Sequence, residues 1–212
     1  MDPLQTLGFA LGTSFASGLN LYATIAAAGI FHRTGLITLP SGLSVLGDPI
    51  VLGLATVLFL VEFVADKIPL VDSLWDTLHT FIRPPAAALL AYGAFTTVPE
   101  AWKLAAALLA GGVALSSHSA KATTRAAVNT SPEPVSNWIL SFLEDGVAVF
   151  LVWFAAEHPI ITGVTVVVLV VLSAILVWKL ARFVQRMWRK VRGLPAEPEP
   201  SPPITVPESP PV

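Results

Sequence analysis

Cysteine is absent from this 212-residue sequence, and Asp, Glu, Lys and Arg together make up only 12% of it. The lack of cysteine excludes disulfide bonds, thiolate metal sites and cysteine nucleophiles. Basic residues are missing from the start of the chain, where the first is Arg33. Because a secretory signal peptide needs a positively charged N-terminal region, we expect the first apolar segment to remain in the mature protein.

Hydrophobic residues make up 54% of the sequence, the mean hydropathy is +0.74 and the formal net charge is −2. This composition is typical of a polytopic membrane protein. The sequence predicts an all-α membrane fold over residues 1–193, with about six transmembrane or half-membrane helices. The apolar segments lie at roughly 4–31, 48–66, 84–98, 101–117, 137–157 and 160–178.

The first segment carries no charged side chain between Pro3 and Phe31. One helix of this length would measure ~43 Å, more than the ~30 Å of a bilayer core, so it must tilt, project or break. Small and hydroxyl residues in 11–20 mark the predicted break. Irregular backbone at membrane depth persists where it is buried or lines a wet cavity, so we predict that Ser17 and Asn20 contact substrate. Close helix packing is the alternative role of these small residues.

Basic residues are distributed unevenly between the predicted segments. With the N-terminus inside, ten of the 12 Lys and Arg face the cytoplasm, and only Arg33 and Lys103 face outward. This bias predicts that both termini are cytoplasmic. The basic stretch 179–192 then either anchors the topology or contacts anionic lipid headgroups. Residues 194–212 are rich in proline and predict a disordered cytoplasmic tail.

A weak internal similarity relates the two halves of the chain. At an offset of 100, matching pairs include Ala10 and Ala110, Gly12 and Gly112, Ser17 and Ser117, and Thr24 and Thr124. The similarity predicts two inverted three-helix repeats, 4–98 and 101–187, an architecture that transporters use with the site between the repeats. Chance identity between Ala-rich helices is the alternative.

A basic group follows the fourth segment. His118, Lys121 and Arg125 recur at spacings of three and four, which places them on one helical face. Such a face suits an anion, because Arg offers a bidentate fork and Lys a point charge. The alternative is a helix end at which the cations reach out of the membrane to lipid headgroups.

Acidic residues interrupt the second and fifth segments. Glu144 and Asp145 are adjacent, at a depth where ionised groups are costly and usually pair with cations or relay protons. We predict that they couple protons or ions together with Glu62 and Asp66. A purely structural ion-pair network is the alternative.

A polar stripe precedes the third segment. Asp72, Asp76, His79 and Arg83 follow at spacings of four, three and four, which places them along one side of a helix. This helix either lies in the membrane interface or enters the protein as a half-helix. Its two carboxylates and one His could bind a metal, but an ordinary solvated face has the same composition, so we predict no metal.

Several motifs of the chain occur together in one known family. They are 17–22 (SGLNLY), 62–69 (EFVADKIP), 75–84 (WDTLHTFIRP), 118–121 (HSAK), 129–134 (NTSPEP), 136–138 (SNW) and 144–145 (ED). Over residues ~8 to ~180 the chain resembles the bacterial membrane family catalogued as domain of unknown function 4126. The resemblance implies an integral protein of the bacterial inner membrane, but no established activity, substrate or catalytic residue.

The favoured hypothesis is a small permease or flippase-like transporter. Its anionic substrate or lipid headgroup would meet the basic group, while the acids carry protons. A membrane scaffold that acts through the basic stretch and the tail is the alternative. An intramembrane enzyme ranks last, because no nucleophile with an evident base is present. We expect no cofactor and no nucleic acid partner; lipid is the expected partner, and a homo-oligomer is left open.

Overall fold

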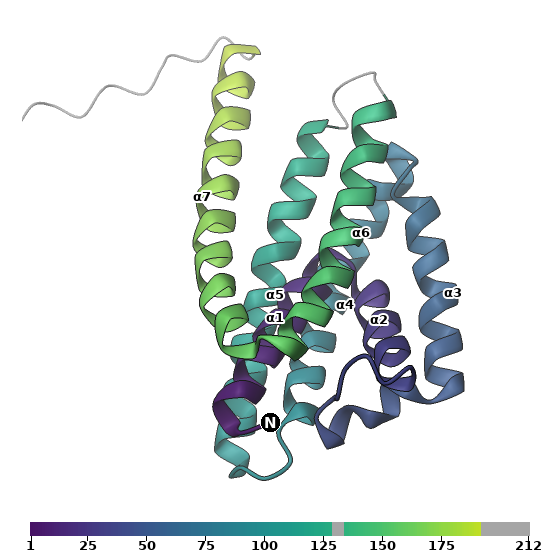
Figure 1. Ribbon diagram of the computed structural model, residues 1–212. Helices are drawn as coiled ribbons and strands as arrows, with labels where there is room; N and C mark the ends of the chain where they lie inside the picture. The colour runs from purple at the N-terminus through teal and green to yellow at the C-terminus, as the bar shows by residue number, and fades with distance from the viewer. Residues whose placement is uncertain (129–133, 192–212) are drawn as a thin grey trace, which may run out of the picture.

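The computed structural model of the protein describes residues 1–128 and 134–191, which form helices and no strand. The all-α fold is therefore confirmed, while the predicted tail, 194–212, lies outside the described residues. In chain order the elements are α1 (Pro3–Leu19), α2 (Leu21–Arg33), the short 3-10 helix η1 (Ser41–Gly47), α3 (Pro49–Ala65), α4 (Pro69–Ala94), α5 (Glu100–Val128), α6 (Pro134–Glu157) and α7 (Pro159–Val191). Figure 1 shows them as an upright bundle with α7 along one side.

Two helices within the described residues are long and apolar enough to cross a membrane. They cover Val135–Glu157 and Pro159–Arg186, with mean hydropathies of 1.8 and 3.0. The bent pair η1 and α3, whose axes meet at 66°, would add a third crossing. The helices α4 and α5 have 26 and 29 residues but carry ionisable side chains, which reduces their hydropathy. Membrane-spanning helices are thus supported, whereas a count of six is not.

The first predicted segment is a helical hairpin. Between α1 and α2, Asn20 is extended (φ −148°, ψ 106°), and its side chain accepts a hydrogen bond from the Ala23 amide at 2.9 Å. This contact caps α2 and stops α1 from continuing. The hairpin enters the bundle from one end and returns to the same end, with its tip near the middle (Figure 1). The predicted break is confirmed, and of the two possibilities for 4–31, a full crossing or a segment that turns back, the structure has the second.

The first helix, α1, is buried along most of its length, from Gly8 to Gly18. Its glycines let neighbouring helices approach closely. Gly8 faces the carbonyl of Pro159 in α7, and Gly18 faces the Ala114 carbonyl and the Ser117 hydroxyl of α5. Small residues in this segment therefore serve close packing as well as the break.

Two predicted helix boundaries differ from the structure. The helix α4 continues through Pro84 and Pro85, and α5 continues past 117 to Val128. Proline removes a backbone donor, but a helix buried among neighbours tolerates that loss. The polar stripe of α4 and the basic face of α5 consequently lie inside the bundle. Of the two predicted arrangements of the polar stripe, this burial fits the helix that enters the protein, and the buried cations of α5 do not extend outward from the bundle.

The hairpin also changes where the chain ends. Because α1 and α2 together return to their starting end, α3 and the later helices alternate so that α7 ends at the opposite end from the N-terminus (Figure 1). The predicted arrangement placed both termini on one side. It counted the hairpin as one crossing.

We expect Gly18→Ala to destabilise the protein, since the added Cβ would overlap the Ala114 carbonyl and the Ser117 hydroxyl. Overpacking of this kind costs roughly 1–3 kcal/mol. Gly53→Ala in α3 is the matched control, because its Cβ would meet nothing within 4 Å. The melting temperature of the purified protein in detergent should fall for the first variant only. Equal melting temperatures would contradict the packing described for α1 and α5.

Candidate functional site

Nine charged side chains are buried beside the tip of the hairpin. The acids are Glu62, Asp66, Asp72, Asp76, Glu144 and Asp145, and the bases are Arg83, Lys121 and Arg125. Each is at most 7% exposed. Together with the buried His79 and His118 they form what we call the charged cluster. Every ionisable residue predicted for the site belongs to it.

The charged cluster contains more acids than bases. Its six acids and three bases leave three carboxylates in excess among the described residues. A further base, Lys67, lies at the edge, half-buried, and donates to the Phe63 carbonyl at 2.8 Å. Burial of an unpaired carboxylate costs several kcal/mol even after relaxation. Lys67 and neutral donors such as Asn20 offset part of this formal excess.

Lys121 is the centre of one group of ion pairs. Its ammonium lies 2.9 Å from Asp66, 3.6 Å from Glu62 and 3.7 Å from Glu144. It also donates to the carbonyl of Leu19, the last residue of α1, at 3.1 Å. One side chain of α5 thus contacts α1, α3 and α6.

Arg125 lies one turn further along α5. Its guanidinium reaches Glu144 through two nitrogens, with Nη2 at 2.5 Å and Nε at 3.1 Å from Oε2. Nη2 also lies 3.2 Å from the carboxylate of Asp66, and Nη1 donates to the Asn137 side chain at 2.9 Å. Both cations of the predicted anion site are therefore paired with carboxylates.

Arg83 and His118 form a second group, deeper in the bundle. Arg83 lies 2.6 Å from Glu62 and donates to the His118 Nδ1 at 2.8 Å. Because a guanidinium only donates, this imidazole nitrogen must accept, so His118 carries its proton on Nε2. That nitrogen lies 2.9 Å from the Thr80 hydroxyl and 3.1 Å from the Asp76 carbonyl.

The hairpin tip is held by the same side chains. Asn20 donates to Asp145 at 2.8 Å, and the Gly18 carbonyl accepts from Arg83 at 2.8 Å. The last carbonyls of a helix lack partners in their own helix and carry partial negative charge, so cations stabilise them. Asn20 thus lies in the site as predicted. Ser17 is buried nearby, but its hydroxyl donates to the Thr13 carbonyl within α1.

The polar stripe of α4 divides between the two groups. Asp72 lies 3.8 Å from Arg125, and Asp76 lies 3.6 Å from Arg83. His79 contacts the Trp75 carbonyl through Nδ1 at 2.8 Å and the Tyr22 hydroxyl through Nε2 at 3.2 Å. Within 1–128 and 134–191, no three His, Asp or Glu side chains are placed to hold a metal ion.

Neutral polar residues complete the site, and the sequence analysis did not select them. They are Tyr22, Thr80, Asn137 and Ser141. Periodicity of charge could not identify them, because they carry none. The family motifs were the available signal, since 17–22, 75–84 and 136–138 contain Tyr22, Thr80 and Asn137, and Asn137 contacts Arg125.

Comparisons with known proteins give one result. A search of curated proteins and a search of solved structures each returned no match. A family model described as a domain of unknown function (DUF4126) matches residues 7–179, which include most of the hairpin and the whole charged cluster. The chain therefore belongs to the DUF4126 family.

Proposed function

We propose that the protein is a small permease or flippase-like transporter of the bacterial inner membrane, and that protons drive it. The excess of buried carboxylates over cations is the observation that carries this proposal. In an apolar surrounding, an acid without a counter-charge becomes protonated. A site with more buried acids than buried bases is suited to bind and release protons during transport.

Unpaired oxygen atoms support the same assignment. Both carboxylate oxygens of Asp76, and one oxygen each of Glu62, Asp66 and Asp145, have no hydrogen-bond partner in the described structure. A buried acceptor left without a partner is costly, and a proton on the carboxyl removes the charge. Glu144 and Asp145 are the most exposed acids of the charged cluster, at 7% each, so we assign them the exchange of protons with water.

The predicted anionic substrate or headgroup can bind the cations only if it replaces a carboxylate that already pairs with them. At present Lys121 and Arg125 contact Glu144, with Nζ 3.7 Å and Nη2 2.5 Å from its Oε2. Protonation of Glu144 removes one of the charges that hold them, the one they share with α6. An anion can then take its place against both cations, and its release allows Glu144 to ionise again. Proton and anion would thus move together.

The hairpin supplies an element that such a cycle can move. Its tip contacts the charged cluster through Asn20 and through the carbonyls of Gly18 and Leu19. Broken helices whose ends meet charged groups are the usual substrate sites of secondary transporters. Protonation of Asp145 would weaken the hydrogen bond that it accepts from Asn20, and this change would couple protonation to the position of the tip.

Two inverted repeats remain part of the proposal. If the hairpin is aligned with α5, then α3 pairs with α6 and α4 with α7. The members of the α3–α6 and α4–α7 pairs run in opposite directions (Figure 1), as inversion requires. The helices α1 and α5, which carry the matches 10/110, 12/112 and 17/117, run in the same direction, so the proposed repeats rest on the two later pairs.

The first test measures access to the charged cluster from each side of the membrane. Because the chain lacks cysteine, Ser17→Cys and Ser141→Cys give single buried thiols that differ from serine by one atom. A transporter should allow a membrane-impermeant maleimide to reach each thiol from both sides. Labelling from one side only, with Ser44→Cys and Ala181→Cys as exposed controls, would contradict alternating access.

A second test examines the proton-driven replacement of the carboxylate. The labelling rate of Ser141→Cys is divided by that of the exposed Ala181→Cys, because the thiolate fraction of any cysteine falls with pH. This ratio should rise as pH falls, since protonation of Glu144 weakens the contacts that bridge α5 and α6. In the double variant with Glu144→Gln, which cannot ionise, the ratio should be high and independent of pH. Glu157→Gln, an exposed acid of the same helix, is the control and should keep the pH dependence. An unchanged profile for Glu144→Gln would refute the coupling.

A third test concerns orientation. Lys67 and the exposed Lys179, Arg182 and Arg186 lie toward the end of the bundle where α7 ends, so the positive-inside rule makes that end cytoplasmic. The N-terminus then faces the periplasm, opposite to the expectation from sequence. Ser44→Cys should be labelled from the periplasm and Ala181→Cys only after the cytoplasmic side is opened. The reverse pattern would invert this orientation.

The scaffold hypothesis depends on the basic stretch 179–192, most of which belongs to α7, and on the tail, which lies outside the described residues. Truncation after Gly193 separates the two functions. A permease should keep its phenotype in a strain that needs the protein, since the truncation leaves the charged cluster intact. A scaffold that works through the tail should lose it. Arg125→Ala in the full chain should abolish the phenotype if the protein is a permease. It should leave the phenotype unchanged if the protein is a scaffold.

A further inference from the structure

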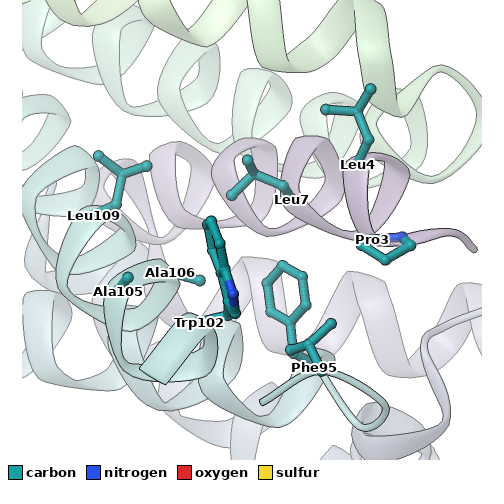
Figure 2. A pocket seen from close by; sticks show the side chains of 9 residues that line it. Pro3, Leu4, Leu7, Phe95, Trp102, Ala105, Ala106 and Leu109 are labelled. Atoms are coloured by element: carbon teal, nitrogen blue, oxygen red, sulfur yellow. The ribbon is translucent and has the colours of Figure 1, made fainter. Parts of the chain in front are cut away.

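A pocket lies at the opposite end of α1 from the charged cluster. It has a volume of about 340 Å³, and its walls come from the start of α1, the connection after α4 and the first turns of α5. Figure 2 shows Leu4 and Leu7 on one side of it, with Phe95 and Trp102 opposite. Leu7 and Leu19 are twelve residues apart in α1, or ~18 Å along the helix. The pocket is therefore separate from the charged cluster.

A second, polar pocket of about 240 Å³ adjoins the first. The two share Pro3, Phe95 and Val98 in their walls. The polar pocket adds the hydroxyl residues Thr6, Ser41, Thr96 and Thr97, and the Ser41 and Thr96 hydroxyl oxygens lie 3.4 Å apart. No charged side chain lines either pocket.

We propose that the two pockets together bind one neutral membrane amphiphile. Its acyl chain occupies the apolar pocket, and its uncharged, hydroxyl-bearing headgroup, of the glycerol ester kind, occupies the polar one. The inference is independent of the transport proposal, because it uses no residue of the charged cluster.

The chemistry of the walls selects this class of ligand. Hydroxyl side chains both donate and accept, as a glycerol headgroup does. A phosphate would need a cation in the pocket to offset its desolvation, and the charge that the walls supply is the N-terminal ammonium of Met1, a residue that is 51% exposed and so in contact with water. Trp102, which is 69% exposed, lies at the wall of the apolar pocket, where an indole suits the boundary between lipid and water.

The test uses the full chain in detergent and a monoacylglycerol with a photoactivatable group in its acyl chain. Cross-links should map to peptides from the start of α1 and the start of α5, and unlabelled monoacylglycerol should compete. Ala105→Trp, an exposed wall residue, should lower the cross-linking at least ~10-fold by filling the pocket. Ala101→Trp, exposed on the same helix but outside the walls, should leave it unchanged.

Headgroup selectivity is tested separately. Thr96→Val should weaken the competition by monoacylglycerol roughly 5-fold, the worth of one hydrogen bond. Competition by an alkane of the same chain length, which has no headgroup, should change little. Should Ala105→Trp lower the melting temperature, Leu4→Trp replaces it, because Leu4 is 62% exposed. Three results would overturn the proposal: cross-links spread evenly over α3, α6 and α7, unchanged cross-linking in the pocket variants, or equal competition by an anionic phospholipid.

Discussion

The ion pair between Arg125 and Glu144 joins helices that otherwise contact each other little. Arg125 belongs to α5 and Glu144 to α6, and the same guanidinium reaches Asp66 at the end of α3. In an apolar bundle a cation without its carboxylate would cost several kcal/mol, so these helices are held in one arrangement. Lys121 and Arg83 extend the same constraint to the end of α1.

Stability and function place opposite demands on such a network. Fully paired, it would be a rigid structural element, and hydrophobic residues of similar volume could replace it at little cost. The excess of three carboxylates is difficult to explain by stability alone. The proposed exchange of protons would be a physical reason for keeping excess acids in a membrane bundle.

The hairpin is the second constraint, and it depends on small residues. Gly18 lets α1 approach α5 closely enough for Ser117 to donate to the Phe15 carbonyl at 2.9 Å. Asn20 ends one helix and caps the next, and its remaining donor contacts Asp145. One residue thus sets the local backbone and joins the hairpin to the charged cluster, which is why the break lies beside the site.

Much of this protein could be predicted from local pattern alone. Apolar runs determined the helical class, the spacing of His118, Lys121 and Arg125 placed them on one face, and the small residues before Asn20 marked the break. Tertiary structure decided that the broken segment returns to its starting end, that α4 continues through Pro84, and which carboxylate each cation meets. Those outcomes depend on packing between distant helices, because a buried charge or a missing backbone donor is tolerated only where another helix supplies its partner. Periodicity describes one helix at a time and carries no information about that partner.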